Sequence, residues 1–294
     1  MNNPNKGVIG VIGGSGLYNL DNIENSKSIE TETPFGKPSE QIITGEIEGV
    51  RIAFLSRHGV GHRLNPSEIN YRANMYALKS LGVNKLISST AVGSLKEEIA
   101  PTHLVIPDQY IDNTFKREKT YFENGIVAHV SMANPVCPFY SKLAYKVSVE
   151  TGLKSHLGGV YYNMEGPQFS SKAESEFYRG LDCSVIGMTQ AIEAKLAKEL
   201  EICFIPIAFV TDYDCWHPET DNVTAEMVVK NLKKNISNSI KLILKLIKTI
   251  DTSVPDCSCR QSLKGAILNN PNNLETNVID RMKPIIGKYL TKEK

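Results

Sequence analysis

The sequence predicts an α/β protein with a mixed central β-sheet flanked by helices on both faces. Short apolar runs alternate with longer segments that carry helix-capping residues, as in sheets whose strands are connected by helices. Polar residues follow the apolar runs at Ser15, Arg57, Thr90 and Asp212, and in open α/β sheets ligands bind at the carboxyl ends of strands. We expect the whole chain to form one domain, with a C-terminal extension from about residue 251.

Composition narrows the classes of function. Of the 294 residues, 41% are hydrophobic and 22% are charged, and the formal net charge is +1, which is ordinary for a soluble globular protein. This balance predicts no nucleic-acid or acidic-surface partner. No apolar run approaches the roughly 18 residues of a membrane span, and the polar N-terminus MNNPNK does not resemble a signal peptide. We therefore expect a cytoplasmic protein whose six cysteines are reduced.

The first part of the chain is expected to contain five strands and one long helix. A helix should begin at Asn65, which can cap it, with Glu68 completing a capping box and Gly82 ending the helix. Glu48 and Gly49 predict the turn of a hairpin. Apolar runs bounded by turn residues predict strands at 8–12, 41–47, 50–56, 83–89 and 103–110.

The second part alternates helices with strands. Pro138 opens a helix that Gly152 closes, and Ser171 with Glu174 forms a capping box for the next helix. Further strands are expected at 159–167, 183–188 and 202–210, and further helices at 190–200, about 224–250 and after Pro271.

Two glycine-containing segments after strands suit an anion. The turn GGSG, residues 13–16, exposes backbone amides and the Ser15 hydroxyl, and its glycine spacing does not match the dinucleotide fingerprint. The segment SSTAVGS, residues 88–94, reads as a strand end followed by the loop TAVGS at 90–94, which offers hydroxyls and amides at Thr90 and Ala91. Each segment alone is equally typical of an ordinary turn.

A third segment, RHGVGH at residues 57–62, adds positive charge. His58 and His62 are four residues apart, a spacing that can bind zinc on a helix. The two glycines between them disfavour a helix, so we expect no metal and interpret Arg57 and His58 as anion donors. Together the three segments predict a phosphate site. We expect Arg57→Ala to weaken phosphate binding and to leave the fold intact.

Two carboxylates follow the last predicted strand. Asp212 and Asp214 come directly after the apolar run 202–210, where a charge is costly unless something binds it. A ligand is one interpretation. The alternative is that one aspartate caps local backbone, as aspartates often do after strands.

Several motifs together resemble a known family. GVIGGSGL, TPFGKPS, RHGVGHRLNPSEINYRAN, TAVGSLKEE, MEGPQFSSKAE and TDYDCW occur in order from residue 7 to about 230, and they are similar to motifs of the 5'-methylthioadenosine phosphorylases. That family lies in the trimer-forming branch of the purine nucleoside phosphorylases. The resemblance implies a nucleoside phosphorylase-like fold and phosphorolysis of methylthioadenosine to adenine and 5-methylthioribose 1-phosphate. It implies no metal or organic cofactor, with inorganic phosphate as co-substrate.

The resemblance also implies roles for particular residues. The phosphate set comprises Ser15, Arg57, His58, Thr90, Ala91 and Thr189, and Arg57 is expected to bind two phosphate oxygens at once. The purine contacts and catalytic residues are Asp212 and Asp214, with Ser170 as a further purine contact. Other substrate contacts are Phe169 and Met188 at the ribose, Ala225, Val228 and Val229 at the 5' substituent, and His62. His129 corresponds to a residue that reaches the 5' pocket of a neighbouring subunit, so a homotrimer or a dimer of trimers is expected.

Three positions depart from the family pattern. Gly187 stands where members carry Asn, Gln168 where they carry Arg, and Ala225 where a larger aliphatic residue is common. The first two adjoin ribose contacts, and the third could widen the 5' pocket. Ala225, Val228 and Val229 also fit one apolar helix face, for which plain core packing is an equally ordinary explanation.

Alternatives remain open at this stage. A purine nucleoside phosphorylase acting on adenosine or on 6-oxopurine nucleosides such as inosine is one, although the 6-oxopurine group carries Asn where this chain has Asp212. A non-catalytic nucleotide- or anion-binding protein on the same scaffold is another, since fold does not fix function. Cys257 and Cys259 could form a strained disulfide or remain thiols, and a reducing compartment favours thiols.

Overall fold

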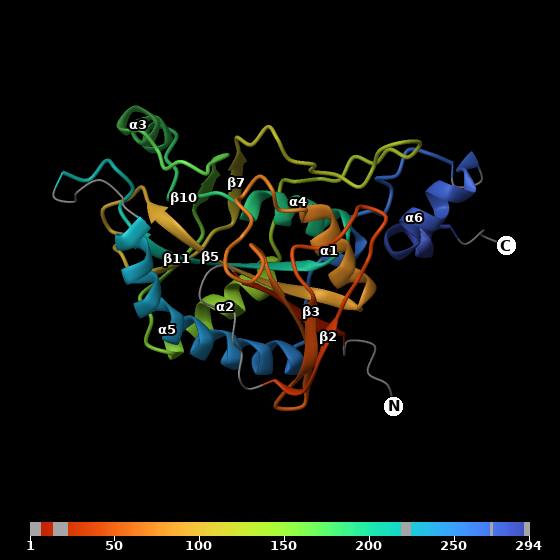
Figure 1. Cartoon of the computed structure of the whole chain (residues 1–294), viewed down its shortest axis with the longest axis horizontal. Helices are drawn as coiled ribbons and strands as arrows, with labels where there is room; N and C mark the ends of the chain where they lie inside the picture. The colour runs from red at the N-terminus through yellow and green to blue at the C-terminus, as the bar shows by residue number, and fades with distance from the viewer. Residues whose placement is uncertain (1–6, 14–22, 219–224, 271–272, 291–294) are drawn as a thin grey trace.

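The computed structural model describes residues 7–13, 23–218, 225–270 and 273–290, without the side chains of 225–230 and 232–235. These residues form an 11-stranded mixed sheet with helices on both faces (Figure 1), which confirms the predicted fold class. The main path of the sheet runs β2-β3-β4-β1-β5-β10-β9-β7, and β11 branches from β5 toward β6 and β8. Among the described helices, none is long and apolar enough to cross a membrane.

The central strands are parallel, and this brings their carboxyl ends together. β1 (Val8–Gly13) pairs in parallel with β4 (Val50–Ser56) and with β5 (Val83–Ser94), and β5 pairs in parallel with β11 (Cys203–Asp212). All residues of β11 are buried, as its near-continuous apolar run predicts. The residues that follow β4 and β11 therefore lie at one edge of the sheet, together with the last residues of β5.

The predicted hairpin is confirmed. β3 (Ile42–Ile47) and β4 pair antiparallel with Ile47 opposite Val50. Glu48 and Gly49 have φ of 48° and 78°, the left-handed conformation that two-residue hairpin turns need. β2 (Glu24–Ile29), which extends this sheet edge, was not predicted, because five of its six residues are exposed and its sequence ENSKSI has no apolar alternation.

The first helix begins later than predicted. The Asn65 side chain accepts hydrogen bonds from the backbone N–H groups of Ser67 and Glu68, and Glu68 accepts from the Asn65 N–H in return. These capping contacts close an isolated turn, and the helix α1 (Tyr71–Ser80) starts with a second cap, Asn70. The sequence therefore predicts the capping contacts of Asn65 and Glu68 correctly, but these contacts close a turn and do not begin the helix.

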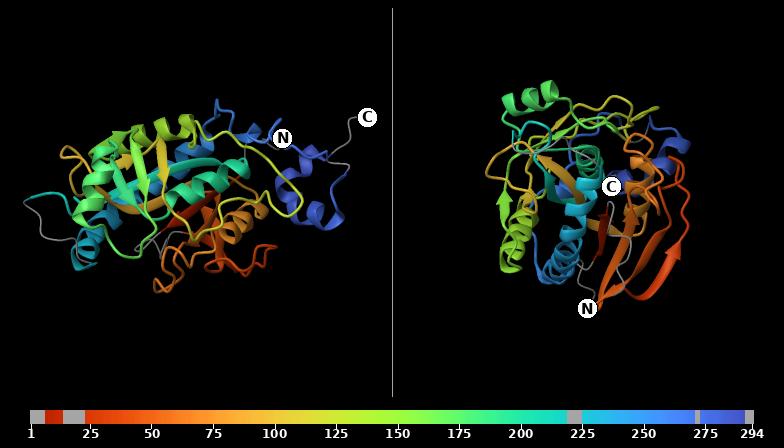
Figure 2. Two further views of the ribbon diagram at one scale, coloured as in Figure 1. Left: turned by 90° about the horizontal axis from the view of Figure 1, so that it is seen from above. Right: turned by 60° about the vertical axis from the view of Figure 1, so that its left-hand side comes forward.

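Helices cover the sheet in two layers. α2 (Pro138–Glu150) and α5 (Ala225–Thr252) pack on one face, and α1 and α4 (Gln190–Glu199) pack on the other (Figure 2). α6 (Thr276–Ile286) packs against α1 at one end of the molecule. The starts of α2 and α4 agree with prediction. α3 (Lys172–Gly180) has the predicted capping box, in which Ser171 and Glu174 each bond the other's backbone.

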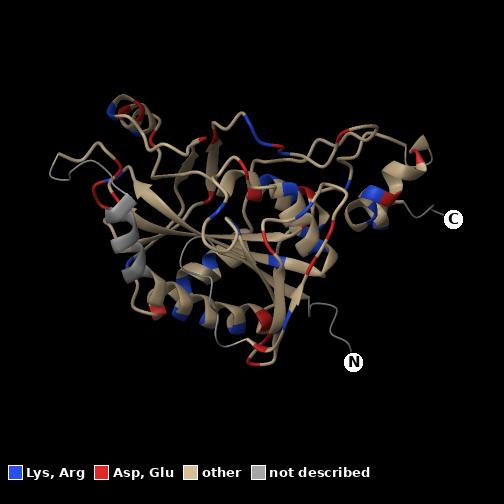
Figure 3. Cartoon of the chain, viewed as in Figure 1, with Lys and Arg blue, Asp and Glu red and all other residues tan. Residues whose placement is uncertain are grey.

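The remaining elements are short. They are β6 (Leu104–Ile106), β7 (Gln109–Asp112), β8 (Ser155–Leu157), β9 (Val160–Asn163), β10 (Val185–Gly187) and the 3-10 helices η1 (Cys259–Gln261) and η3 (Gly287–Tyr289). The predicted strand 103–110 is thus two strands, and β8 was not predicted. Basic and acidic residues are interspersed over the helices and loops (Figure 3), in keeping with the near-neutral net charge.

Candidate active site

A cavity of about 540 Å³ lies at the carboxyl ends of β5, β10 and β11. Eleven of the sequence-predicted site residues line it. They are Arg57, His58, His62, Thr90, Ala91, Phe169, Ser170, Met188, Thr189, Asp212 and Asp214. These residues come from segments up to 157 positions apart in the chain (214 minus 57), so the fold gathers them as the strand-end pattern predicted.

Arg57 is fully buried, but its guanidinium is already engaged. Its Nε and Nη2 groups donate to the two carboxylate oxygens of Glu193, at 2.5 and 3.0 Å. Nη2 also donates to the Ser88 hydroxyl at 3.0 Å, and Nη1 donates to the Ser89 carbonyl at 2.9 Å. Four of the five N–H donors are therefore used, and one on Nη1 remains. Arg57 was predicted to bind two phosphate oxygens, but with one N–H donor left it can donate to only one.

The Arg57–Glu193 pair also changes the expected behaviour of Arg57 variants. Both side chains are almost fully buried, with 0% and 2% exposure. Removing one partner of such a pair leaves an uncompensated buried charge, which costs about 3–5 kcal/mol. The buried pair therefore argues against the expectation that Arg57→Ala leaves the fold intact, and we expect the variant to be less stable. Sequence reasoning missed Glu193, because nothing in the sequence links positions 57 and 193.

His58 faces the cavity as a neutral imidazole. Burial, followed by the positive charge of Arg57, lowers the pKa of His58 to about 3. Its Nδ1 lies 2.9 Å from the Leu64 carbonyl oxygen, which can only accept, so Nδ1 carries the proton. Nε2 is then an acceptor, and the predicted role of His58 as an anion donor is corrected. The ring stacks on His62 with centroids 4.1 Å apart.

Thr189 lies at the N-terminus of α4 and presents a hydroxyl without a partner. It occupies the cap position, but its side chain makes no capping hydrogen bond; Asn163 Oδ1 instead accepts from the Ala191 N–H at 3.0 Å. Thr189 Oγ1 is buried and has no hydrogen-bond partner among the described residues. A helix N-terminus favours negative charge, and the hydroxyl adds a donor at the same place. Together these groups could hold an anion.

Thr90 and Ala91 lie inside β5 and not in a loop. β5 continues to Ser94 because β11 pairs with it over its whole polar end, with Ala208 opposite Thr90 and Phe209 opposite Ala91. The predicted strand end at 89 and the predicted loop at 90–94 are therefore wrong. The two residues still line the cavity, and their role in binding phosphate stays a prediction.

A bulge in β11 brings Asp212 against β5. The pairing register shifts between Val210 and Asp212, which places Asp212 opposite Gly93. A Cβ atom on Gly93 would lie 2.9 Å from Asp212 Oδ1 and 3.1 Å from Ile186, so only glycine leaves room for the carboxylate here. Bulges commonly re-aim a side chain beside a functional site, and this one directs Asp212 into the cavity.

Asp212 is a buried carboxyl group with a raised pKa. Oδ2 accepts from the Thr211 hydroxyl at 2.7 Å, and Oδ1 accepts from the Asp214 N–H at 2.8 Å. Burial raises the pKa of Asp212 to about 6, against the opposing effect of these two hydrogen bonds. The group can therefore carry or release a proton near neutral pH.

Asp214 supplies the oxygen that lacks a partner. Its Oδ2 is buried and has no hydrogen-bond partner among the residues described. Its φ of 52° is the left-handed conformation, which aspartate tolerates better than most residues. Burial raises the pKa of Asp214, although the nearby hydroxyls of Ser175 and Ser170 lower it. The backbone-capping role considered for one aspartate thus falls to Asp212, and Asp214 lines the cavity while one of its oxygens stays buried.

The middle of the cavity is mostly apolar. Phe169, Met188, Met164 and Ile236 contribute to its wall, with Ser239 beside Ile236. Phe169 is 45% exposed, so it lies at the cavity rim. Ile236 and Ser239 of α5 were not predicted.

The Gly187 departure has a structural reason. A Cβ atom on Gly187 would lie 1.9 Å from the hydroxyl oxygen of Tyr161, a fully buried residue of the neighbouring strand β9. The tyrosine thus fills the space that a side chain at 187 would need. We find no comparable contact that explains Gln168.

Other predicted residues are not part of this cavity as described. Ser15 lies outside the described residues, and so do the side chains of Ala225, Val228 and Val229. The backbone N–H of Arg57 donates to the Gly13 carbonyl at 2.9 Å, which brings the end of β1 to the site. His129 lines a second cavity of about 250 Å³ with Lys119, Lys195 and Glu199, and it does not reach the first cavity of its own chain.

Comparison with known proteins gives consistent results. A family model described as the phosphorylase superfamily matches residues 8–248. The S-methyl-5'-thioadenosine phosphorylase of Geobacter sulfurreducens is 48% identical over 284 residues, covering 96% of this chain and 99% of the relative. That of Chloroflexus aurantiacus is 50% identical, covering 96% and 98%.

Solved structures show the same relationship. A methylthioadenosine phosphorylase from an Antarctic soil metagenomic library has a TM-score of 0.91 at 43% identity, covering 96% of this chain and 99% of the other. The methylthioadenosine phosphorylase of Schistosoma mansoni, in complex with adenine, has a TM-score of 0.82 at 30% identity, covering 85% and 93%. The chain therefore belongs to the phosphorylase superfamily and, within it, to the family of the S-methyl-5'-thioadenosine phosphorylases.

Proposed function

We propose that this protein cleaves 5'-methylthioadenosine with inorganic phosphate, releasing adenine and 5-methylthioribose 1-phosphate for salvage. A phosphate oxygen forms a bond to C1' of the ribose, and the C1'–N9 bond breaks with its electron pair moving to the purine. The relatives' activity supports the reaction, and the distribution of polar groups in the cavity supports the roles below. Phosphate is the co-substrate, and the reaction needs no other cofactor.

The spacing of the two polar ends of the cavity fits a nucleoside. Thr90 belongs to the proposed phosphate end, and Gly93, which contacts Asp212, belongs to the purine end. They are three residues apart on β5, about 10 Å at roughly 3.3 Å per residue. A ribose with its phosphate on one side and its base on the other fits between them. The apolar wall at Met188 and Ile236 would face the sugar and its 5' substituent.

The phosphate end suits a monoprotonated phosphate. Thr189 Oγ1, the remaining N–H of Arg57 and the α4 N-terminus would donate to its oxygens. His58 Nε2 would accept a hydrogen bond from the phosphate O–H, because its Nδ1 proton is held by Leu64. Positioning and preorganised charge would supply most of the rate enhancement.

The purine end is the observation that carries the substrate assignment. Protonated Asp212 can donate to N7 as negative charge develops on the base, which is general-acid behaviour. Its other oxygen can accept from the 6-amino group of adenine, and Asp214 helps to position that edge of the base. A 6-oxopurine would place its own acceptor there, and an unmatched buried polar pair costs about 1–3 kcal/mol. The adenine bound to the Schistosoma relative agrees with a 6-aminopurine preference.

We also propose a homotrimer, or a dimer of trimers, acting in the cytoplasm. His129 lines a second cavity and not the active-site cavity of its own chain, so we propose that it contributes to a neighbouring subunit's site. None of the six cysteines, all of which lie in the described part of the chain, is in a disulfide, as in proteins of a reducing compartment. Sedimentation at working concentration gives the oligomeric state, and a fully active monomer would contradict the proposal.

Initial rates test the proposed reaction. Methylthioadenosine, adenosine and inosine are each assayed with and without phosphate, and released base is quantified. We expect phosphate-dependent adenine release, fastest from methylthioadenosine, slower from adenosine and negligible base release from inosine. Faster cleavage of inosine would favour a 6-oxopurine nucleoside phosphorylase, and binding without cleavage would favour a non-catalytic protein.

A further inference from the structure

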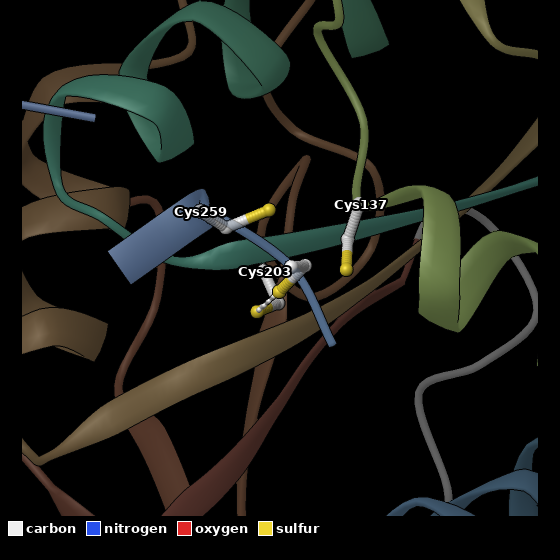
Figure 4. A group of neighbouring side chains, drawn as sticks. Cys137, Cys203 and Cys259 are labelled. Atoms are coloured by element: carbon white, nitrogen blue, oxygen red, sulfur yellow. Dashed lines mark hydrogen bonds between the residues drawn. The ribbon is translucent and has the colours of Figure 1, made fainter. Parts of the chain in front are cut away.

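Four of the six cysteines converge at one point far from the active site. The Sγ atoms of Cys137, Cys203, Cys257 and Cys259 all lie within 4.8 Å of one another (Figure 4). Three of the four residues are buried, and the fourth, Cys257, is partly buried. They lie in the apolar core between the sheet and the layer formed by α2 and α5. The mechanism proposed above uses none of them.

Three separate segments supply these cysteines. Cys137 is the N-cap of α2, and its backbone N–H donates to the Phe204 carbonyl at 2.9 Å, which fixes it beside the start of β11. Cys203 is the first residue of β11. Cys257 and Cys259 come from the segment after α5, at the start of η1. Asp212 is at the other end of β11, about 30 Å away at roughly 3.3 Å per residue.

We propose that these four cysteines form a structural Zn²⁺ site. Tetrahedral zinc with four thiolates has Zn–S distances of about 2.3 Å, so its sulfur atoms are about 3.8 Å apart. The Cys203 and Cys257 sulfurs are already 3.7 Å apart, and the other pairs need to close by no more than about 1 Å, within reach of small side-chain rotations. Four sulfur ligands from the protein complete the coordination shell, which is the arrangement of structural and not catalytic zinc.

The surroundings fit the charge of such a site. Zinc with four thiolates carries a net charge of −2, which needs compensation in an apolar core. Lys85 is fully buried and lies opposite Cys203 on the neighbouring strand β5, and Arg260 directly follows Cys259. Lys85 thus places a cation beside one of the ligands, as outer-shell groups do in metal sites.

A zinc ion here would fasten the C-terminal segment to the sheet. Without it, side-chain packing, the Cys203–Cys257 thiol contact and a hydrogen bond from the Leu263 N–H to Glu201 attach the segment after α5 to this part of the fold. Zinc thiolate bonds persist in a reducing compartment where disulfides do not form. The expected consequence is greater stability with little change in the chemistry at the distant cavity.

Metal analysis of the reduced protein tests the proposal independently of its enzymatic activity. The full chain is produced without an affinity tag that binds metal, and zinc is measured by mass spectrometry of the elements. We expect about one zinc per chain in the wild type and less than about one fifth of that in Cys257→Ser/Cys259→Ser. Cys183→Ser removes a buried thiol outside the cluster and should keep its zinc.

Two further measurements use the wild type, so they test the proposal even if the cysteine variants fail to fold. Cobalt is exchanged into the wild type, and we expect the visible bands and sulfur-to-metal charge transfer of tetrahedral thiolate coordination. A strong chelator should lower the melting temperature of the wild type, and added zinc should restore it. A zinc-free wild type with six alkylatable thiols, or with a disulfide between any two of the four cysteines, would overturn the proposal.

Discussion

The backbone N–H of Asp214 donates a 2.8 Å hydrogen bond to Oδ1 of Asp212. One aspartate thereby holds the other in place, and the two carboxyl groups reach the cavity with different duties. Asp212 has both oxygens in hydrogen bonds and a pKa raised to about 6 by burial, whereas Asp214 keeps one buried oxygen without a partner among the described residues. Protonated Asp212 is therefore suited to present a donor beside an acceptor, the complement of the N7 and 6-amino edge of adenine, while Asp214 helps to position that edge.

The raised pKa of Asp212 predicts a cost in stability above pH 6. The folded state binds the proton more tightly than the unfolded chain, so stability falls as pH rises from about 4 to about 6 and then stays reduced. The full effect of the shift is about 3 kcal/mol. Asp212→Asn removes this charge, so we expect it to melt a few degrees higher than wild type at pH 7.5 and at nearly the same temperature at pH 4. Melting curves across this range check the prediction, and a variant that is less stable at pH 7.5 would contradict it.

The buried Arg57–Glu193 pair predicts a structural cost for Arg57→Ala. The variant leaves the Glu193 carboxylate buried and uncompensated, and we expect a loss of about 3–5 kcal/mol in the free energy of unfolding. The double variant Arg57→Ala/Glu193→Gln removes that charge and should recover part of the stability, while its Michaelis constant for phosphate stays raised. Denaturant unfolding and phosphate kinetics on both variants separate the two effects. Equal stability of wild type and Arg57→Ala would show that the pair is not important for the fold.

The unpartnered hydroxyl of Thr189 predicts a specific role in phosphate binding. A hydrogen bond to a charged group contributes about 1.5–3 kcal/mol, so Thr189→Val should raise the Michaelis constant for phosphate roughly 10- to 100-fold. Its melting temperature should not fall, because the lost hydroxyl has no partner among the described residues. Thr189→Ser keeps the hydroxyl and serves as the control. Unchanged phosphate kinetics in Thr189→Val would remove this residue from the site.

The contact between Gly93 and Asp212 predicts that a single methyl group disturbs the purine end. In Gly93→Ala the new Cβ would lie 2.9 Å from Asp212 Oδ1, so the carboxylate must shift. A misplacement of about 1 Å can reduce activity by roughly 100-fold, and we expect kcat/KM for methylthioadenosine to fall by about 10- to 100-fold. Gly180→Ala meets no atom within 4 Å and should behave as wild type. Wild-type activity in Gly93→Ala would show that the close approach is unimportant.

Local signals in the sequence predicted much of the fold. The Ser171–Glu174 capping box and the Glu48–Gly49 turn involve residues close in sequence, and the structure confirms both. The same kind of signal misled at Asn65, where the capping contacts close a turn that does not continue as a helix. The polar end of β5 was missed for a different reason: its strand conformation comes from pairing with β11, more than one hundred positions away.

The chemistry of the candidate site was hard to predict from the sequence for the same reason. Strand-end residues indicated where the cavity would be, but the partners that decide their chemistry are distant in sequence. Glu193 lies 136 positions further along the chain and accepts hydrogen bonds from Nε and Nη2 of Arg57. This contact is one reason why Arg57 keeps a single N–H donor for phosphate, where two were predicted. The cysteine cluster likewise forms only when α2, β11 and the segment after α5 meet. The sequence showed the close pair Cys257 and Cys259 but gave no reason to join it to two distant cysteines.

The central claim is that Asp212 reads position 6 of the purine, and one comparison tests it most directly. Rates of phosphorolysis of 5'-methylthioadenosine and 5'-methylthioinosine are measured for the wild type and for Asp212→Asn, whose amide always offers a donor. We expect the wild type to prefer the 6-amino substrate by about 10⁴ or more, as sites built around a buried hydrogen bond can. We expect Asp212→Asn to lose activity on methylthioadenosine and to shift the ratio toward methylthioinosine. An unchanged ratio would contradict the assignment of Asp212.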